Sequence, residues 1–186
     1  MTAVEAPLTL NQLAVVLGRY RFVELILFET VGRAVRACLD PSLTVVLSGA
    51  SHAHAYRARQ IEELLLVSAG LADAAVSTAP ADEAHRDALE KVDVLDPKML
   101  ASCLVNLWYP LMADSYQQHL MRCNRVSDGS VRRLLLRLIF DLGTITEELA
   151  AVAGIGGPVS PELVVQYGDE RQSLEQNDGP FGTRWA

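Results

Sequence analysis

The sequence predicts an all-α protein, and three observations support this fold class. Apolar residues recur every three or four positions along four long segments, which is the pattern of helices with one side in a core. Helix-start signals precede these segments, and short loops separate the first from the second and the third from the fourth. With 186 residues, half of them apolar, the chain is expected to form one four-helix bundle domain over residues 1–186.

The first two helices begin at recognisable caps. Thr9 and Gln12 form a capping-box pattern, and Asp40 before Pro41 is typical of an N-cap followed by proline in the first turn. The inner stripe of the first helix is Leu10, Leu13, Leu17, Tyr20, Glu24, Phe28, Val31 and Val35, ending at Cys38. The inner stripe of the second helix is Leu47, Ala50, His54, Ile61 and Leu65, with Gly70 as the expected stop.

The last two helices follow the same rules. Asp96 before Pro97 repeats the start signal, and Ser127 or Asp128 is expected to cap the final helix. The third inner stripe is Leu100, Cys103, Leu107, Leu111, Asp114 and Met121. The fourth is Val131, Leu134, Leu138, Asp141, Ile145 and Glu148.

The lengths of the connections predict the topology. Short loops make each helix pair an antiparallel hairpin. Residues 71–95 form a longer connection, first Ala-rich and then charged, which is expected to cross from one end of the bundle to the other between helices 2 and 3. The bundle therefore covers about residues 10–152, and residues 153–186 are expected to form an irregular tail on the surface or on a second subunit.

Composition disfavours several classes of function. A net charge of −7 argues against nucleic acid as the main partner. No run of about 18 residues is free of charged side chains, so no transmembrane helix is expected. The N-terminus lacks the basic start and apolar core of a secretion signal, and the widely spaced Cys38, Cys103 and Cys123 fit reduced thiols. We therefore expect a cytoplasmic protein without a membrane partner.

Four ionisable residues occupy inner positions where apolar residues are expected: Glu24, His54, Asp114 and Asp141. An unpaired ionisable group is costly to bury, so these residues should pair with each other or bind something. Folding the first hairpin at its loop brings Glu24 level with Arg57, one turn from His54. Folding the second brings Asp114 within a turn of Asp141. The sequence thus predicts a central site at one depth, whereas His52, His85 and His119 are expected outside it.

Larger side chains are expected to line a pocket beside this site, namely Tyr20, Arg57, Tyr109 and Tyr116. Pro110 removes a backbone donor within the third helix and should kink it, which would leave room for a small molecule. Structural alternatives remain open. Glu24 is placed to form a buried ion pair with Arg57 or Arg21, and His54 to be a hydrogen-bonded core histidine.

Three short runs resemble bacterial ferritin-like domain proteins: Tyr20-Arg-Phe-Val-Glu-Leu-Ile-Leu-Phe-Glu29, His52-Ala-His-Ala55 and Tyr116-Gln-Gln-His-Leu120. The resemblance covers about residues 10–152 and implies a ferritin-like four-helix bundle with one long crossover. In the metal-binding members, two helices each supply a glutamate and two supply Glu-x-x-His, which together hold a carboxylate-bridged pair of iron or manganese ions.

The resemblance also implies which residues would be ligands here. Glu24 matches the glutamate of the first helix, and Ser51–His54 matches Glu-x-x-His with its glutamate lost. Asp114 stands for the glutamate of the third helix, and Asp141–Thr144 matches the second Glu-x-x-His with its histidine lost. Three carboxylates and one histidine remain, so no cofactor is expected, with one iron or manganese ion or a degraded dinuclear centre as alternatives.

Two classes of function follow. The first is an enzyme that tailors a small organic metabolite, in which Glu24, His54, Asp114 and Asp141 transfer protons or hold a metal. In this class His54 should be the histidine most sensitive to substitution. The second is a non-catalytic bundle that binds a small molecule or a partner protein after losing its metal site. A carboxylate-bridged di-iron oxidase or oxygenase is a further alternative.

Outward apolar residues predict a homodimer. They are Phe22, Leu25, Ile26 and Leu27 on the first helix and Val45, Tyr56 and Leu66 on the second. Two neighbouring helices with more apolar surface than one core covers suggest a two-fold interface. The rival explanation is that the crossover and tail cover this surface within one chain.

Overall fold

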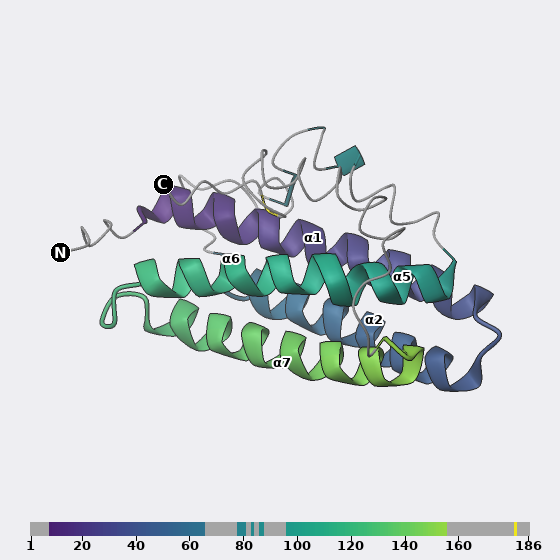
Figure 1. Cartoon of the computed structure of the whole chain (residues 1–186). Helices are drawn as coiled ribbons and strands as arrows, with labels where there is room; N and C mark the ends of the chain where they lie inside the picture. The colour runs from purple at the N-terminus through teal and green to yellow at the C-terminus, as the bar shows by residue number, and fades with distance from the viewer. Residues whose placement is uncertain are drawn as a thin grey trace.

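A computed structural model describes residues 8–65, 78–80, 83, 86–87, 96–155 and 181, and its long helices lie side by side in a bundle (Figure 1). The elements are α1 (Leu10–Ala37), α2 (Pro41–Glu62), α5 (Pro97–Cys103), α6 (Tyr109–Arg122) and α7 (Gly129–Ala153), with the π-helical turn η1 (Leu104–Trp108) joining α5 to α6. No strand occurs among the described residues, so the predicted all-α class is confirmed.

The bundle consists of four rods, because α5, η1 and α6 form one continuous helix. Around the bundle, α1 packs on α2, α2 on α7, α7 on α6, and α5 back on α1. Most of the predicted crossover and all but four residues of the predicted tail lie outside the described residues. In the part of the chain that is described, no helix is long and apolar enough to cross a membrane.

Side-chain N-caps mark the start of three of the four rods, as the sequence predicts. The backbone N–H of Thr9 donates to Gln12 Oε1 at 2.9 Å, and the N–H of Gln12 donates to Thr9 Oγ1 at 3.3 Å. One oxygen of Asp40 accepts from two N–H groups of α2, and one oxygen of Asp96 does the same for α5. Asp128 is the N-cap residue of α7, one of the two predicted, but its side chain accepts from the N–H of Asn124 at 2.7 Å and makes no capping bond to the helix.

The π-helical turn changes which face of the third rod is buried. The backbone N–H of Tyr109 donates to the carbonyl of Leu104, five residues earlier. The turn therefore holds one residue more than an α-helical turn. Pro110, which has no N–H to donate, follows it directly. The buried stripe therefore moves by one position, from the predicted 111 and 114 to Met112 and Ser115.

Several predicted inner positions are wrong: Leu10, Phe28, Met121 and Glu148 are exposed, and so are, wholly or in part, the two predicted site residues Asp114 and Asp141. Asp114 is exposed, because the extra residue of η1 turns it to solvent. Asp141 is only half-buried, because α7 places Leu142 in the core at this level. In a helix of 3.6 residues per turn, residues on one face recur after three or four positions. The next buried residue after Leu138 lies four positions on, at Leu142, and not three positions on, at Asp141.

The outward surface predicted for the first helix is also mostly wrong. Leu27 is fully buried, Phe22 and Ile26 are partly buried against the core, and Leu25 is partly buried as well. On α2, in contrast, Val45 and Tyr56 are exposed as predicted. Leu66 lies outside the described residues.

Two glycines of α7 should respond oppositely to substitution by alanine. Gly154 ends the helix at a φ of 68°, where an L side chain is strained, so Gly154→Ala should lower the free energy of unfolding by about 1 kcal/mol. Gly143 lies inside the helix with open space around its Cα, so Gly143→Ala should raise it by about 0.5–1 kcal/mol. Urea denaturation of both variants measures the two shifts, and equal signs would contradict the assignment of the helix end.

Candidate functional site

Five buried polar side chains meet at the centre of the bundle, and we call them the central cluster. Glu24 comes from α1, His54 and Arg57 from α2, and Tyr109 and Tyr116 from α6. The relative exposure of Glu24, His54 and Arg57 is 0%. Helix α7 supplies only apolar residues to its buried side. The cluster is thus a polar island inside an apolar core.

An ion pair lies at the heart of the cluster. Arg57 Nε is 3.0 Å from both carboxylate oxygens of Glu24. The hydroxyl of Tyr116 donates to Glu24 Oε1 at 3.0 Å. A buried carboxylate is strongly stabilised when several donors surround it, so these contacts hold Glu24 ionised inside the core.

His54 bridges this ion pair to a phenol. Its Nδ1 lies 2.6 Å from Glu24 Oε2, and its Nε2 lies 3.0 Å from the hydroxyl of Tyr109. A carboxylate only accepts, so Nδ1 carries the proton and donates to Glu24. The unprotonated Nε2 then accepts from Tyr109. The resulting order is carboxylate, imidazole and hydroxyl. Arg57 Nη2 lies 2.8 Å from the same Nδ1, but in this tautomer both nitrogens are donors, so that contact is not a hydrogen bond.

Burial and charge shift the pKa values of the cluster in a consistent way. Burial acts to raise the pKa of Glu24, but Arg57 and His54 more than offset this, so it is lowered. Burial, followed by the charge of Arg57, lowers the pKa of His54. Burial also raises the pKa values of Tyr109 and Tyr116. The cluster therefore holds one carboxylate, one guanidinium, a neutral imidazole and neutral phenols.

Two nitrogens near the cluster lack hydrogen-bond partners among the described residues. They are Arg57 Nη1 and Trp108 Nε1, and both are buried. A buried donor without an acceptor costs roughly 1–3 kcal/mol, and ordered water commonly fills such a role. The guanidinium of Arg57 therefore has hydrogen-bond acceptors at Nε and none among the described residues at Nη1, where a small polar group has a donor available.

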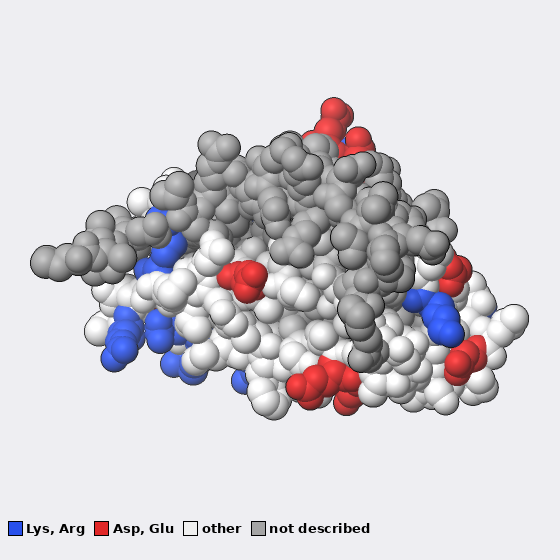
Figure 2. Space-filling model, viewed as in Figure 1, with Lys and Arg blue, Asp and Glu red and all other residues white. Residues whose placement is uncertain are grey.

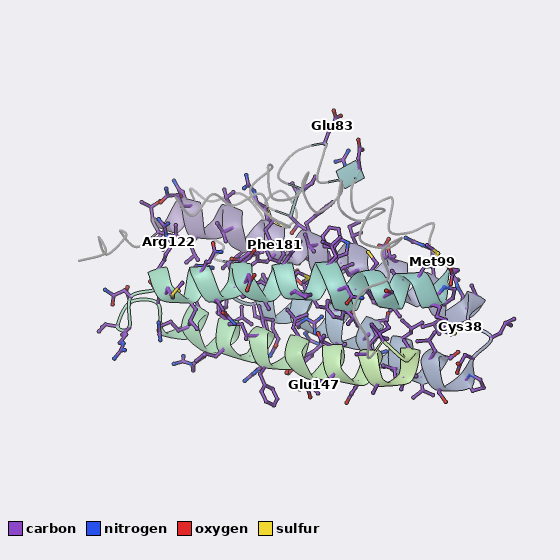
Figure 3. All side chains as sticks on the ribbon, viewed as in Figure 1. Cys38, Glu83, Met99, Arg122, Glu147 and Phe181 are labelled. Atoms are coloured by element: carbon purple, nitrogen blue, oxygen red, sulfur yellow. The ribbon has the colours of Figure 1, made fainter. Side chains whose placement is uncertain are left out.

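A second polar pair adjoins the cluster. The hydroxyl of Tyr20 lies 3.1 Å from His119 Nδ1, and its ring packs edge-on against Tyr116 with centroids 4.8 Å apart. Phe181 lies against both tyrosines, 4.4 Å from Tyr20 and 5.2 Å from Tyr116, between centroids (Figure 3). This aromatic group closes the cluster on that side.

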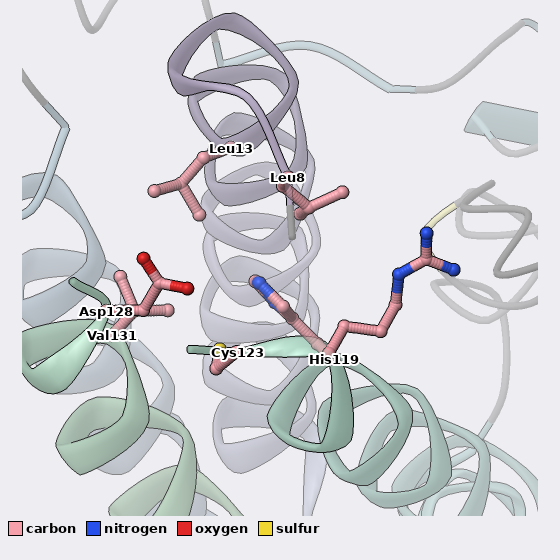
Figure 4. A pocket seen from close by; sticks show the side chains of 7 residues that line it. Leu8, Leu13, His119, Cys123, Asp128 and Val131 are labelled. Atoms are coloured by element: carbon pink, nitrogen blue, oxygen red, sulfur yellow. The ribbon is translucent and has the colours of Figure 1, made fainter. Parts of the chain in front are cut away.

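His119 borders a very small cavity. Figure 4 shows its ring and the carboxylate of Asp128 facing the same space, which has about 10 Å³ for the centre of a water-sized sphere. That volume suits a single water molecule. Burial lowers the pKa of His119 to about 4, with Asp128 opposing and Arg122 assisting the shift. His119, predicted outside the site, is thus a buried neighbour of it.

A larger hollow of about 530 Å³ lies at the end of the bundle where α2 and α5 begin and α7 ends. Its lining includes Cys38, Asp96 and Gly154, and Cys38 is labelled at that end of the bundle in Figure 3. Cys38 follows Glu24 by 14 residues, a distance of about 21 Å along a helix. The hollow is therefore separate from the central cluster.

The residues at the centre do not fit a metal ion. In the described part of the chain, no three His, Cys, Asp or Glu side chains are placed to hold one. Of the four predicted ligands, Glu24 and His54 meet, whereas Asp114 is exposed and Asp141 is half-buried, and neither bonds to the cluster. Arg57 bonds to the carboxylate that a cation would need. The predicted four-residue site is thus corrected to the pair Glu24 and His54.

The predicted pocket residues, in contrast, do come together. Tyr109, Tyr116 and Arg57 contact Glu24 or His54 directly, and Tyr20 packs on Tyr116. They pack as a closed core. Of the two predicted ion-pair partners, Arg57 is the one that binds Glu24, while Arg21 pairs with Glu62 at 3.2 Å.

Comparison with known proteins does not identify the chain. No protein-family model, curated protein or solved structure gives a significant match to it. The ferritin-like resemblance therefore stays a prediction, based on the helix layout and on residues such as Glu24 and His54.

Substitution of Glu24 should destabilise the fold strongly. Glu24→Gln leaves the charge of Arg57 buried without a counter-ion, which typically costs about 3–5 kcal/mol. Glu29→Gln is the matched control, because Glu29 pairs with Arg33 on the surface and such pairs contribute about 0–1 kcal/mol. Denaturant unfolding at pH 7 measures both. Equal small losses would show that the central pair does not form.

Stability should fall in acid partly because of His119. In the unfolded chain a histidine takes up a proton near pH 6.5, whereas folded His119 does so only near about pH 4. The unfolded state therefore binds more protons in this window, and stability decreases as the pH falls from about 6.5 to about 4, on the order of 3 kcal/mol in total. Unfolding of His119→Gln should lack this part of the pH dependence. The exposed His52→Gln should keep it, and identical slopes in both variants would contradict the assignment.

Proposed function

We propose that this protein is a metal-independent, non-catalytic helical bundle that acts by binding another molecule at its surface. The observation that carries this proposal is the buried hydrogen bond between Arg57 Nε and the carboxylate of Glu24. Because the guanidinium supplies the positive charge at the centre, the carboxylate needs no metal ion to remain ionised there. The ferritin-like resemblance supports a bundle of this architecture as the ancestor.

Electrostatics supports the loss of metal binding. Two unit charges about 4 Å apart interact by about 4 kcal/mol at an effective dielectric constant near 20, and a divalent ion doubles this value. A metal beside Glu24 would therefore be repelled by Arg57 about as strongly as one carboxylate attracts it, which cancels the attraction of Glu24. With His54 as the remaining nitrogen ligand, the donor set is too small to compensate.

The pairing within the cluster supports a structural role for it. Glu24, His54 and Arg57 are each bonded to another member of the cluster, and all are fully buried. A buried polar network can select one packing arrangement over others, because wrong pairings leave charges unsatisfied. In this proposal the cluster fixes how α1, α2 and α6 pack, and recognition takes place elsewhere.

A second candidate function is an acid–base enzyme that tailors a small metabolite. The order Glu24, His54, Tyr109 favours it, because a carboxylate that orients an imidazole against a hydroxyl is an arrangement used to move protons in catalysis. Tyr109 would then face the substrate. The proposal ranks second because the Tyr109 side chain is buried, with a relative exposure of 1%.

Metal content tests the first part of the proposal. Protein purified without chelators, and the same protein dialysed after exposure to excess Fe²⁺ or Mn²⁺, should retain less than one ion per chain by native mass spectrometry. Two tightly held ions per chain would contradict the proposal and restore a dinuclear centre.

Comparative metabolite profiling separates the two candidate functions. Wild type, Tyr109→Phe and His119→Gln are incubated with a metabolite extract of the native host, and the small molecules are compared by untargeted mass spectrometry. The non-catalytic proposal predicts the same profile for all three proteins. A compound consumed by wild type and His119→Gln but not by Tyr109→Phe would establish the enzyme instead.

A further inference from the structure

The outward face of α2 is the uncharged side of the bundle. Residues 41–56 contain no Asp, Glu, Lys or Arg over four helical turns. Val45, Gly49, His52 and Tyr56 are exposed and follow steps of four, three and four, so they form one stripe, which we call the α2 stripe. The relative exposure is 71% for Val45 and 56% for Tyr56.

The exposed faces of other helices are different. Helix α1 exposes Glu29 and Arg33. Helix α7 exposes charged side chains of both signs, visible along the lower edge of Figure 2. Depletion of charge together with exposed aromatic and aliphatic residues is the composition found at the centre of protein interfaces. The α2 stripe has this composition, although it carries no group of the central cluster.

Gly49 strengthens this assignment. A glycine inside a helix is less stable than alanine by about 1 kcal/mol. A Cβ atom added at Gly49 would meet nothing within 4 Å, so packing inside the chain does not explain the glycine. A glycine in an apolar stripe does allow another helix to approach closely.

We propose that the α2 stripe is the interface of a homodimer, in which α2 packs antiparallel against α2 of a second copy about a two-fold axis. The axis passes between residues 50 and 51. In a two-fold interface residue i meets j and j meets i, so paired residue numbers sum to a constant. Here that sum is 101, which places Val45 against the partner's Tyr56 and Gly49 against the partner's His52. The missing side chain of Gly49 leaves room for the imidazole ring.

Charge at the two ends of the stripe selects a second copy in this orientation. Asp40 precedes the uncharged segment and Arg59 follows it, and both are exposed. Arg59 also pairs with Glu63 of its own helix at 3.6 Å. Antiparallel packing sets Arg59 beside the partner's Asp40, so opposite charges meet at both ends. Parallel packing would place Asp40 against the partner's Asp40.

Helix α1 extends the apolar surface. Ser51 donates to the backbone carbonyl of Phe28 at 3.0 Å, so Phe28 lies on α1 at the level of the two-fold axis. Its relative exposure is 39%. A stable interface needs about 800 Å² from each partner, more than one helical stripe supplies. Phe28 lies beside the middle of the stripe, where it supplies part of this additional contact area.

Light scattering coupled to size exclusion tests the dimer and its register together. Wild type should be a dimer at about 50 µM, a concentration well above the micromolar Kd expected of a modest interface. Val45→Glu and Tyr56→Lys should each raise the Kd at least about tenfold, because each buries an unpaired charge. The double variant Val45→Glu/Tyr56→Lys should regain the dimer, since each glutamate then faces a lysine of the other copy. Within one chain these positions are about 16 Å apart, too far to pair.

Phe140→Glu is the matched control, because Phe140 on α7 has a relative exposure of 73%, similar to that of Val45, and lies outside the stripe. It should leave the dimer intact, and helical circular dichroism should confirm that all variants are folded. A monomeric wild type at this concentration would overturn the proposal. A dimer broken by Phe140→Glu but not by Val45→Glu would show that the interface does not lie at the α2 stripe. Failure of the double variant to recover would overturn the antiparallel register. None of these outcomes depends on whether the central cluster is catalytic.

Discussion

The ion pair between Glu24 and Arg57 is the interaction on which the rest of the core depends. Both side chains are removed from water, so each is tolerable only because the other is present. The pair sets the height of α1 against α2, since a shift of one turn would separate the charges. It also sets the protonation of His54, whose Nδ1–H is needed by the carboxylate, and through His54 the orientation of the Tyr109 hydroxyl.

The π-helical turn provides the other half of this arrangement. By adding one residue before Tyr109, η1 turns the following helix so that Tyr109, Tyr116 and His119 face the core. Without the added residue, Asp114 would point inward and bring a second carboxylate towards Glu24. The turn therefore favours phenols over acids around the ion pair. This substitution of neutral donors for carboxylates is consistent with a centre balanced by one guanidinium.

Much of this arrangement follows from local sequence, and the remainder has a specific physical cause. Caps at Thr9, Asp40 and Asp96 determine where rods begin, and a short loop after α1 is enough to place Glu24 level with Arg57. Periodicity cannot reveal a π-helical turn, because the pattern before and after it is helical. Pro110 indicates that the helix is irregular at this point, but not which way the residues after it are rotated.

The other errors concern the choice between helical steps of three and four. Asp141 and Leu142 are both allowed by helical spacing, and the core selects the apolar residue. His119 lies more than one helical turn from Asp114, outside the site that periodicity predicts, yet it belongs to the shifted stripe. For α7, the consistently apolar stripe through Leu138, Leu142 and Leu149 indicates the buried side.

The central claim is that a guanidinium occupies the place of a metal ion beside Glu24. Diffraction from crystals grown with excess Mn²⁺, with anomalous data sensitive to manganese, tests it most directly. We expect Arg57 Nε within hydrogen-bond distance of the Glu24 carboxylate and no anomalous peak between Glu24 and His54. An anomalous peak bonded to both residues, with Arg57 turned away, would contradict the account.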